Sequence, residues 1–364
     1  IVSPLWGAMS DVSGRRRIFL VASSLGAALL LPLFGLMGTV WQVLGLRFLF
    51  SLVAMAFPPV AIAAMSIGSD PERRGRSLSA YHTSRALGFL IGWGGSGILL
   101  DAVGFQGTYM VFGAVGLAGA AAAVRVQGID TPTSITLSEV WREARDRWVP
   151  APSDRILRSA GMHYLFLGIF LRKVAIIGIL SLIAVYAVDV LGHSRTLLGI
   201  VLALNPLSQL LFLDFFGTVA DRRGRRSALL VGFLPTIAFP LMLLHATSPV
   251  VFGATYVLLG FCFAAIVQGS TAFIGDVAPD GRQGELMGVR KSAQGLAGVI
   301  GPLLAGMTAT LYGYGVMLTM TAGLTVAALL VVWTGVGEPL DDPASETSLR
   351  RDYLDSLWFR RTTD

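Results

Sequence analysis

One short motif occurs twice in this chain, at residue numbers that differ by 210. The first copy covers residues 7–17 and the second covers residues 217–226, and both fit the pattern G-x-x-x-D-x-x-G-R-R. An apolar run precedes each copy and another follows it. We therefore predict a tight, basic turn between two hydrophobic helices, present once in each half of an internally repeated chain.

The repeat continues beyond this turn. With an offset of 209, three glycines fall on three others: Gly75 on Gly284, Gly92 on Gly301, and Gly97 on Gly306. On these motifs the chain resembles the major facilitator superfamily, whose members join two six-helix halves and carry the basic turn between helices 2 and 3. The resemblance implies an all-α polytopic membrane protein with two pseudo-symmetric bundles.

The composition agrees with a membrane protein. Hydrophobic residues make up 54% of the chain and charged residues 14%, with a mean hydropathy of +0.69. A soluble domain carries about a quarter charged residues. We therefore expect that water is not the main solvent in contact with the surface of this protein. The single cysteine, Cys262, rules out a disulfide framework.

Apolar windows long enough to cross a bilayer divide the chain into two sets separated by a polar interval. A stub at 1–8 suggests the end of a further span, and residues 337–364 form a polar tail. The ten predicted spans lie near 18–38, 41–67, 79–100, 107–125, 161–190, 195–217, 227–246, 249–275, 285–312 and 314–336.

The basic residues predict the orientation. Of 28 Lys and Arg, 21 lie in alternate loops or the tail, whereas the opposite loops hold only Arg195. Because positive loops stay in the cytoplasm, we expect a multi-pass protein of the cell membrane with a cytoplasmic C-terminus. The net charge of +6 comes from these loops and does not indicate nucleic-acid binding.

The repeat also predicts the domain organisation. Residue 1 aligns with residue 211, so we expect that the first helix of a twelve-helix transporter and most of the second are absent. The predicted parts are a truncated N-terminal bundle at 1–125, a cytoplasmic linker with an amphipathic helix at 126–159, a six-helix bundle at 160–336, and a cytoplasmic tail at 337–364.

The resemblance gives the two basic turns a role as the inner gate. In the family the motif acid docks on a helix start in the other half, which implies that Asp11 meets the start near Gly284 and Asp221 the start near Gly75. Three further arginines, Arg16, Arg17 and Arg226, are expected to act only as topology signals. The other gate residues implied are Gly7, Gly14, Gly217 and Gly224, which permit close approach and the turn, and the pairs of Arg15 with Asp70 and of Arg225 with Asp276.

A glycine-rich run in the first half resembles the family's antiporter motif, G-x-x-x-G-P-x-x-G-G. Trp93 stands where the motif has proline, and the run contains Gly88, Gly92 and Gly97. The second-half copy keeps Gly301 and Pro302, followed by Gly306. Glycines at this spacing allow close helix packing, so generic packing and an exporter-specific role both fit.

Charges inside the predicted spans are candidates for a solute pathway, because a charge in the bilayer is costly without a cavity or a partner. These are Arg47, Arg85, Arg172 and Lys173. Neighbouring helical residues point about 100° apart, so we favour Arg172 over Lys173 as the cavity-facing cation. Structural pairing, or reaching toward the headgroups, is the alternative for each.

Acids are scarcer within the spans, and only Asp214 lies clearly inside one. Three explanations of ion coupling remain: a carboxylate on the absent first helix, Asp214 itself, or coupling to something other than protons. Uncharged polar candidates, which serve equally well as contacts between helices, are Tyr186, Asn205, Gln209 and Gln268.

No enzyme or cofactor signature appears. The four histidines lack metal-ligand spacing, no P-loop pattern is present, and no nucleophile lies beside a base. The sequence thus predicts a monomeric transporter without cofactor, moving a small solute by alternating access, with export of an organic or anionic compound favoured. The alternatives are a proton- or cation-coupled uptake symporter and, in another class, a membrane receptor or scaffold.

Overall fold

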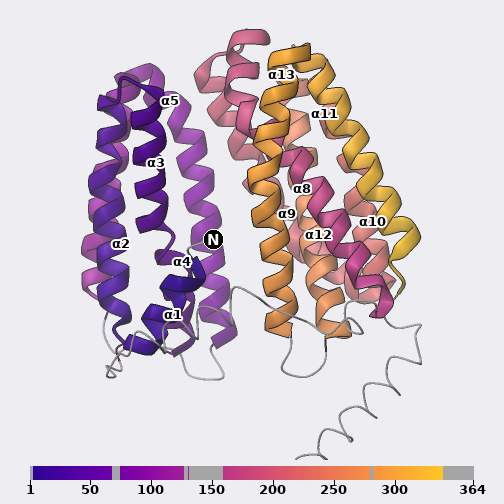
Figure 1. The fold of residues 1–364 in the computed structure, drawn as a ribbon, viewed down its shortest axis with the longest axis horizontal. Helices are drawn as coiled ribbons and strands as arrows, with labels where there is room; N and C mark the ends of the chain where they lie inside the picture. The colour runs from indigo at the N-terminus through magenta and orange to yellow at the C-terminus, as the bar shows by residue number, and fades with distance from the viewer. Residues whose placement is uncertain (1–2, 68–73, 127–129, 131–158, 279–282, 339–364) are drawn as a thin grey trace, which may run out of the picture. The chain divides into compact units, whose positions relative to one another are not determined.

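The structure is a computed structural model that describes residues 3–67, 74–126, 130, 159–278 and 283–338. Nearly all of these residues are helical, and none of them lies in a strand, which confirms the all-α prediction. The chain divides into two compact units, Ile1–Val149 and Pro150–Asp364 (Figure 1). The amphipathic helix expected in the linker and most of the predicted tail lie outside the described residues.

The first unit begins with a short helix that leads into the first basic turn. A capping box starts its third helix: Gln42 N donates to Thr39 Oγ1, and the Gln42 side chain accepts from the Thr39 N–H. The elements are α1 (Ser3–Ser13), α2 (Arg16–Leu30), η1 (Pro32–Leu36), α3 (Val40–Ala54), α4 (Phe57–Ile67) and α5 (Arg74–Val124).

The second unit contains the longer and better buried helices. Two of them, α8 and α13, pack closely together, as do α9 and α12. The elements are η2 (Ser159–Gly161), α8 (Met162–Val185), the π-helical turn η3 (Tyr186–Val190), α9 (Arg195–Arg223), α10 (Arg225–Thr236), α11 (Ala238–Leu243), α12 (Pro249–Val277) and α13 (Gln283–Gly335).

The two longest helices are each interrupted by one glycine. Gly104 (φ 68°, ψ −177°) breaks α5, and Gly313 (φ 86°, ψ 165°) breaks α13. This combination of angles is essentially confined to glycine. The two positions differ by 209, the offset found in the sequence, so the repeat is present in the backbone as well.

These breaks reconcile the observed helices with the predicted spans. Eight stretches among the described residues are long and apolar enough to cross a bilayer, and the stretches Thr83–Val124 and Leu286–Gly335 each contain one of the breaks. Counting the parts on both sides of each break gives ten spans, as predicted. The chain is therefore a multi-pass membrane protein.

Apolar side chains form a separate core in each unit. In the first, Leu20, Val60 and Ala123 lie together. In the second, one core surrounds Tyr256 toward one end of the helices and another surrounds Phe233 toward the other. The Leu20 core and the Phe233 core lie near the helix ends that carry the basic turns.

Candidate functional site

The second basic turn consists of one residue between two helices. Gly224 (φ 92°) separates the end of α9 at Arg223 from the start of α10 at Arg225. A Cβ atom at this position would lie 2.6 Å from Glu338 Oε2. Both the backbone angle and the crowding therefore require glycine here.

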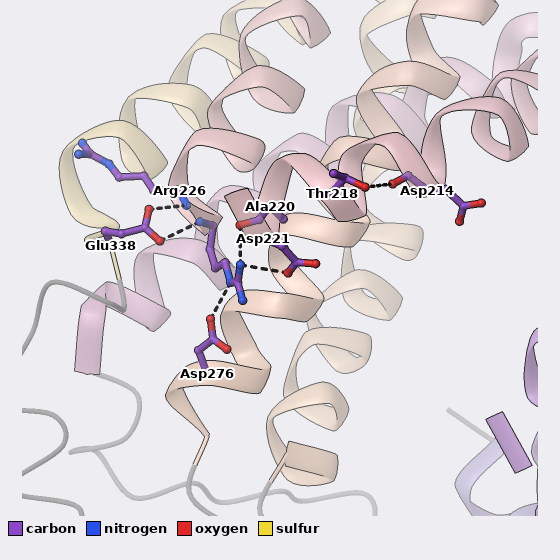
Figure 2. A network of polar contacts seen from close by, with 8 residues as sticks. Asp214, Thr218, Ala220, Asp221, Arg226, Asp276 and Glu338 are labelled. Carbon is purple, nitrogen blue, oxygen red and sulfur yellow. Dashed lines mark hydrogen bonds and ion pairs between the residues drawn. The ribbon is translucent and has the colours of Figure 1, made fainter. Parts of the chain in front are cut away.

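Glu338, just after α13, caps the start of α10. Its Oε1 accepts a hydrogen bond from Arg225 N at 2.8 Å, and its Oε2 accepts one from Arg226 N at 3.0 Å (Figure 2). The first N–H groups of a helix lack partners within the helix and carry partial positive charge. The carboxylate satisfies two of them and ties the turn to the end of α13.

The side chain of Arg225 connects three helices. Its Nε donates to Asp276 Oδ2 on α12 at 2.7 Å, and its Nη1 donates to the Ala220 carbonyl oxygen on α9 at 2.5 Å. The same Nη1 lies 3.1 Å from Asp221 Oδ1. The Asp276 side chain is 30% exposed and that of Asp221 is 71% exposed. The Arg225–Asp276 pair expected from the sequence is present, and it is the better shielded of the two ion pairs.

Arg226 corrects one expectation. Its Nη2 donates to the Trp333 carbonyl oxygen at 2.7 Å, which joins α10 to the last turn of α13. A helix end has carbonyl groups without partners and a partial negative charge, so a guanidinium is well placed there. The expectation that Arg226 serves only as a topology signal is wrong.

The first basic turn has two residues between its helices instead of one, and its ion pair is shifted by one residue. Gly14 (φ 61°) follows α1, and its N–H donates to the Ser10 carbonyl oxygen at 3.0 Å. Arg16 Nη2 lies 3.2 Å from Asp11 Oδ1, with the Arg16 side chain only 8% exposed. Arg16 is thus another arginine with a specific contact, while Arg15 is exposed. Its expected partner Asp70 lies outside the described residues.

Arg17, like Arg226 and Arg16, was expected to act only as a topology signal, and it too makes specific contacts. Its backbone N–H donates to Asp130 Oδ1 at 3.0 Å, and its Nη2 donates to the Val124 carbonyl oxygen at the end of α5. Glu338 and Arg226 make the corresponding contacts in the second unit. The sequence analysis missed both acids, Asp130 and Glu338. Each follows the last predicted span of its half, and the two positions differ by 208, so the repeat could have indicated them.

The remaining gate glycines differ in their surroundings. Gly7 is buried, and a Cβ on Gly217 would lie 3.3 Å from Gln268 Nε2. The side chain of Gln268 donates to the Leu213 carbonyl oxygen at 3.1 Å. A larger residue at position 217 would therefore press on this link between α9 and α12.

The charges predicted inside the spans divide into exposed and buried cases. Arg47 and Arg85 are exposed, and the Arg85 guanidinium carbon lies 5.5 Å from the Phe89 ring centroid. Arg172 is 4% exposed, and its Nε donates to Thr236 Oγ1 at 3.1 Å. Its neighbour Lys173 is only partly buried. The cation we favoured as cavity-facing is thus the more buried of the two.

A fifth charge, Arg290 on α13, was missed. Its Nη1 donates to Ser270 Oγ at 2.8 Å and to Thr271 Oγ1 at 3.1 Å, both on α12. The signal was simply a basic residue inside an apolar window, the criterion that selected the other four.

The uncharged polar candidates all make bonds within the second unit. Tyr186 Oη donates to the Leu243 carbonyl oxygen at 3.0 Å, and Gln268 reaches α9 as described above. Gln209 Nε2 donates to Asn205 Oδ1 at 2.5 Å along α9. These bonds favour roles in packing between or along helices, the alternative kept open for these residues.

Asp214 stands apart from the arginine network. It is exposed, and Thr218 Oγ1 donates to its backbone carbonyl oxygen at 3.2 Å. Figure 2 shows its carboxylate directed away from the contacts of Asp221 and Asp276. Its coupling role stays a prediction.

The glycine motifs give close packing at one position. A Cβ on Gly301 would lie 2.5 Å from the Val174 carbonyl oxygen and 3.1 Å from Gly178 N, so α13 crosses α8 with backbones in contact. Pro302 follows at once inside α13. No described atom lies within 4 Å of a Cβ built on Gly88, Gly92 or Gly306. The packing role expected for these three glycines stays a prediction, whereas Gly97 is buried.

A metal centre finds no support among the residues that the structure describes, since they contain no group of three His, Cys, Asp or Glu suited to a metal ion. The geometry instead presents helix-end networks at both basic turns and cations within the spans. The networks at the basic turns hold helices together at one end of each unit.

Comparison with known proteins identifies the family. The model of the Major Facilitator Superfamily matches residues 1–204 and 165–360. The chain belongs to the major facilitator superfamily.

Among curated relatives of this superfamily member, "Multidrug resistance protein MdtG" of Citrobacter koseri is 23% identical over 92% of this chain and 81% of its own length. "Uncharacterized MFS-type transporter YuxJ" of Bacillus subtilis is 26% identical over 92% of this chain and 84% of its own length.

Solved structures share the fold. A bacterial homologue of the human lysosomal transporter Spinster, inward-facing and occupied, matches with a TM-score of 0.65 and 12% identity over 92% of this chain and 89% of that one. The human organic anion transporter MFSD10 (TETRAN) matches with a TM-score of 0.59 and 19% identity over 91% and 80%. This major facilitator is accordingly a transporter of small solutes and not an enzyme.

Proposed function

We propose that the chain exports a small organic or anionic compound across the cell membrane by alternating access, with its C-terminus in the cytoplasm. The observation that carries this proposal is membership of the major facilitator superfamily together with the relatives named for multidrug resistance. The organic-anion name of one structural neighbour and the cations within the spans support an anionic solute.

The two basic turns supply the proposed inner gate. Each arginine network fixes a turn to its own unit, by Arg225 with Asp276 in the second unit and by Arg17 with Asp130 in the first. When a turn is held in this way, its motif acid moves together with the whole unit. Such an acid is stabilised at the positive start of a helix. Docking of Asp11 and Asp221 on helix starts of the opposite half would close the inner side.

Counterflow in proteoliposomes tests the transport itself. The purified chain is reconstituted with a trapped unlabelled compound, and accumulation of the labelled compound is followed for a panel of organic anions and cations, with protein-free liposomes as the control. We expect exchange of at least one organic anion. Absence of exchange for every compound would reject transport and favour the receptor or scaffold.

The direction is tested separately in vesicles of known orientation. Under an imposed pH gradient, export predicts accumulation inside everted vesicles and little accumulation inside right-side-out vesicles. The reverse result would replace export by uptake through a symporter.

A further inference from the structure

The centre of the second unit holds a buried guanidinium that is only partly satisfied. Arg172 lies near the middle of the span Met162–Val190 and is 4% exposed. Its Nε donates to Thr236 Oγ1 at 3.1 Å, and that hydroxyl donates onward to the Gly232 carbonyl oxygen at 2.8 Å. Its Nη2 is buried and has no hydrogen-bond partner among the described residues. One end of the side chain is thus anchored while the other lacks an acceptor.

The next residue along α8 is a second cation. Lys173 Nζ is 5.7 Å from the Phe263 ring centroid on α12, and the residue is only partly buried. The ring face supplies modest attraction to an ammonium group, but it offers no hydrogen-bond acceptor of the strength of a carboxylate. Lys173 therefore adds a second positive charge that has only a ring face as its partner.

No described carboxylate neutralises these two charges. Neither Arg172 nor Lys173 forms an ion pair with an acid among the side chains that the structure describes. Asp221, Asp276 and Glu338 are committed to the basic turn at the inner end of the unit. Asp189 in η3, beyond the end of α8, and Asp214 on α9 are both exposed. The middle of the unit carries two adjacent positive charges without a counter-ion from this part of the chain.

Elementary electrostatics makes this arrangement unfavourable as it stands. Removing an ion from water into a low-dielectric interior costs several kcal/mol unless it is paired and hydrogen-bonded, and two like charges side by side add repulsion. A guanidinium offers five N–H donors in a planar fork that matches an anion. A single negative group at Nη2 would satisfy the orphaned donor and reduce the net positive charge of the two residues.

We propose that one anionic group binds at Arg172 Nη2, where the charge of the neighbouring Lys173 adds attraction. The chemistry suits a small inorganic anion or the carboxylate of an organic solute. If the anionic group is a solute carboxylate, the inference rests on the proposed function, because the carboxylate then belongs to the transported compound. If it is an inorganic anion, the inference holds whether or not the chain transports anions. These are the two sources that the experiment must distinguish.

Thermal stability of the full chain in detergent micelles reports binding without requiring transport. Sodium chloride or sodium benzoate is titrated at constant ionic strength against sodium HEPES, whose anion is bulky and hydrophilic. A ligand bound only by the folded protein raises Tm with concentration, by about 5 °C at roughly 100 times its Kd. Calorimetric titration with the same two anions gives Kd directly.

Three substitutions locate the site. Arg172→Gln should weaken anion affinity at least tenfold, because the fork and its charge are lost; Lys173→Gln should weaken it severalfold. Lys291→Gln removes an exposed lysine from α13 of the same unit and should leave affinity unchanged. Should Arg172→Gln fail to fold, Arg172→Lys keeps the charge, loses the fork, and is expected to bind about tenfold more weakly.

The outcomes separate the two sources. Stabilisation by chloride alone identifies an inorganic counter-ion, by benzoate alone a solute carboxylate, and by both a site for any small anionic group. The proposal is overturned if neither anion raises Tm, or if Arg172→Gln and Lys173→Gln bind as the unsubstituted chain does. Counterflow without anion binding would sink this inference alone, and anion binding without counterflow would sink the proposed function alone.

Discussion

At the scale of single residues, the two acids after the last spans change the view of the basic motif. Asp130 and Glu338 accept backbone N–H bonds at the starts of α2 and α10, and arginines of the same turns donate to the carbonyl ends of α5 and α13. Opposite charges thus meet opposite helix ends. The motif therefore forms its contacts with residues that are distant from it in the sequence.

Glu338→Ala should lower the free energy of unfolding by about 1 kcal/mol, the usual cost of losing a helix N-cap. Two N–H groups at the start of α10 would lose their acceptor, and Tm should fall by a few degrees. The measurement is thermal unfolding in detergent followed by tryptophan fluorescence. Asp214→Asn, which neutralises an exposed carboxylate of α9 outside this network, is the matched control and should unfold as the parent does. Equal Tm values for all three proteins would show that the cap contributes nothing.

At the scale of elements, one helix crossing dominates the second unit. Gly301 on α13 faces the Val174 carbonyl oxygen and Gly178 on α8, so the two backbones touch without intervening side chains. Contacts of this kind supply van der Waals packing in a membrane, where apolar burial between helices gains little. The crossing lies beside Pro302, which removes one backbone hydrogen bond from α13.

Gly301→Ala should destabilise the second unit by about 2 kcal/mol, a typical cost of overpacking. The added methyl group would lie 2.5 Å from a carbonyl oxygen that cannot move without shifting α8. Gly306→Ala, on the same helix, places a methyl group where no described atom lies within 4 Å. Because alanine is the better helix former, that control should be neutral or slightly more stable. The measurement is the Tm of both variants in thermal unfolding. Similar Tm values would argue against a tight crossing of α8 and α13.

At the scale of the whole molecule, the proposed inner gate joins elements that the sequence repeat relates by pseudo-symmetry. Each unit holds its own turn through several contacts, whereas the docking between halves would depend on the single acids Asp11 and Asp221. Alternating access requires a contact that can break, and differences of a few kcal/mol suffice to shift such an equilibrium. The gate is therefore expected to respond to one charge.

Asp11→Asn should shift the population toward the inward-open state. Losing about 1 kcal/mol changes a two-state ratio about fivefold, so a cysteine at the inner end of α13, introduced as Met287→Cys, should react severalfold faster from the cytoplasmic side. The native Cys262 is fully buried and should add little background. Asp189→Asn neutralises an acid at the other end of α8 and should leave the labelling rate unchanged. Equal rates in Asp11→Asn and its parent would contradict the proposed docking of Asp11 at the inner gate.

The sequence by itself determined the all-α class, the ten spans and the internal repeat, because hydrophobic length, loop charge and a glycine spacing of 209 are local or periodic signals. The resemblance to the family also implied Asp276 as the partner of Arg225, and this ion pair is present. Only the tertiary structure decided that Arg16 rather than Arg15 meets Asp11, that Asp130 and Glu338 cap the turns, and that Arg172 is buried beside Thr236. These contacts join residues from about 5 to more than 110 positions apart, and helix rotation and packing select them, which no short motif encodes.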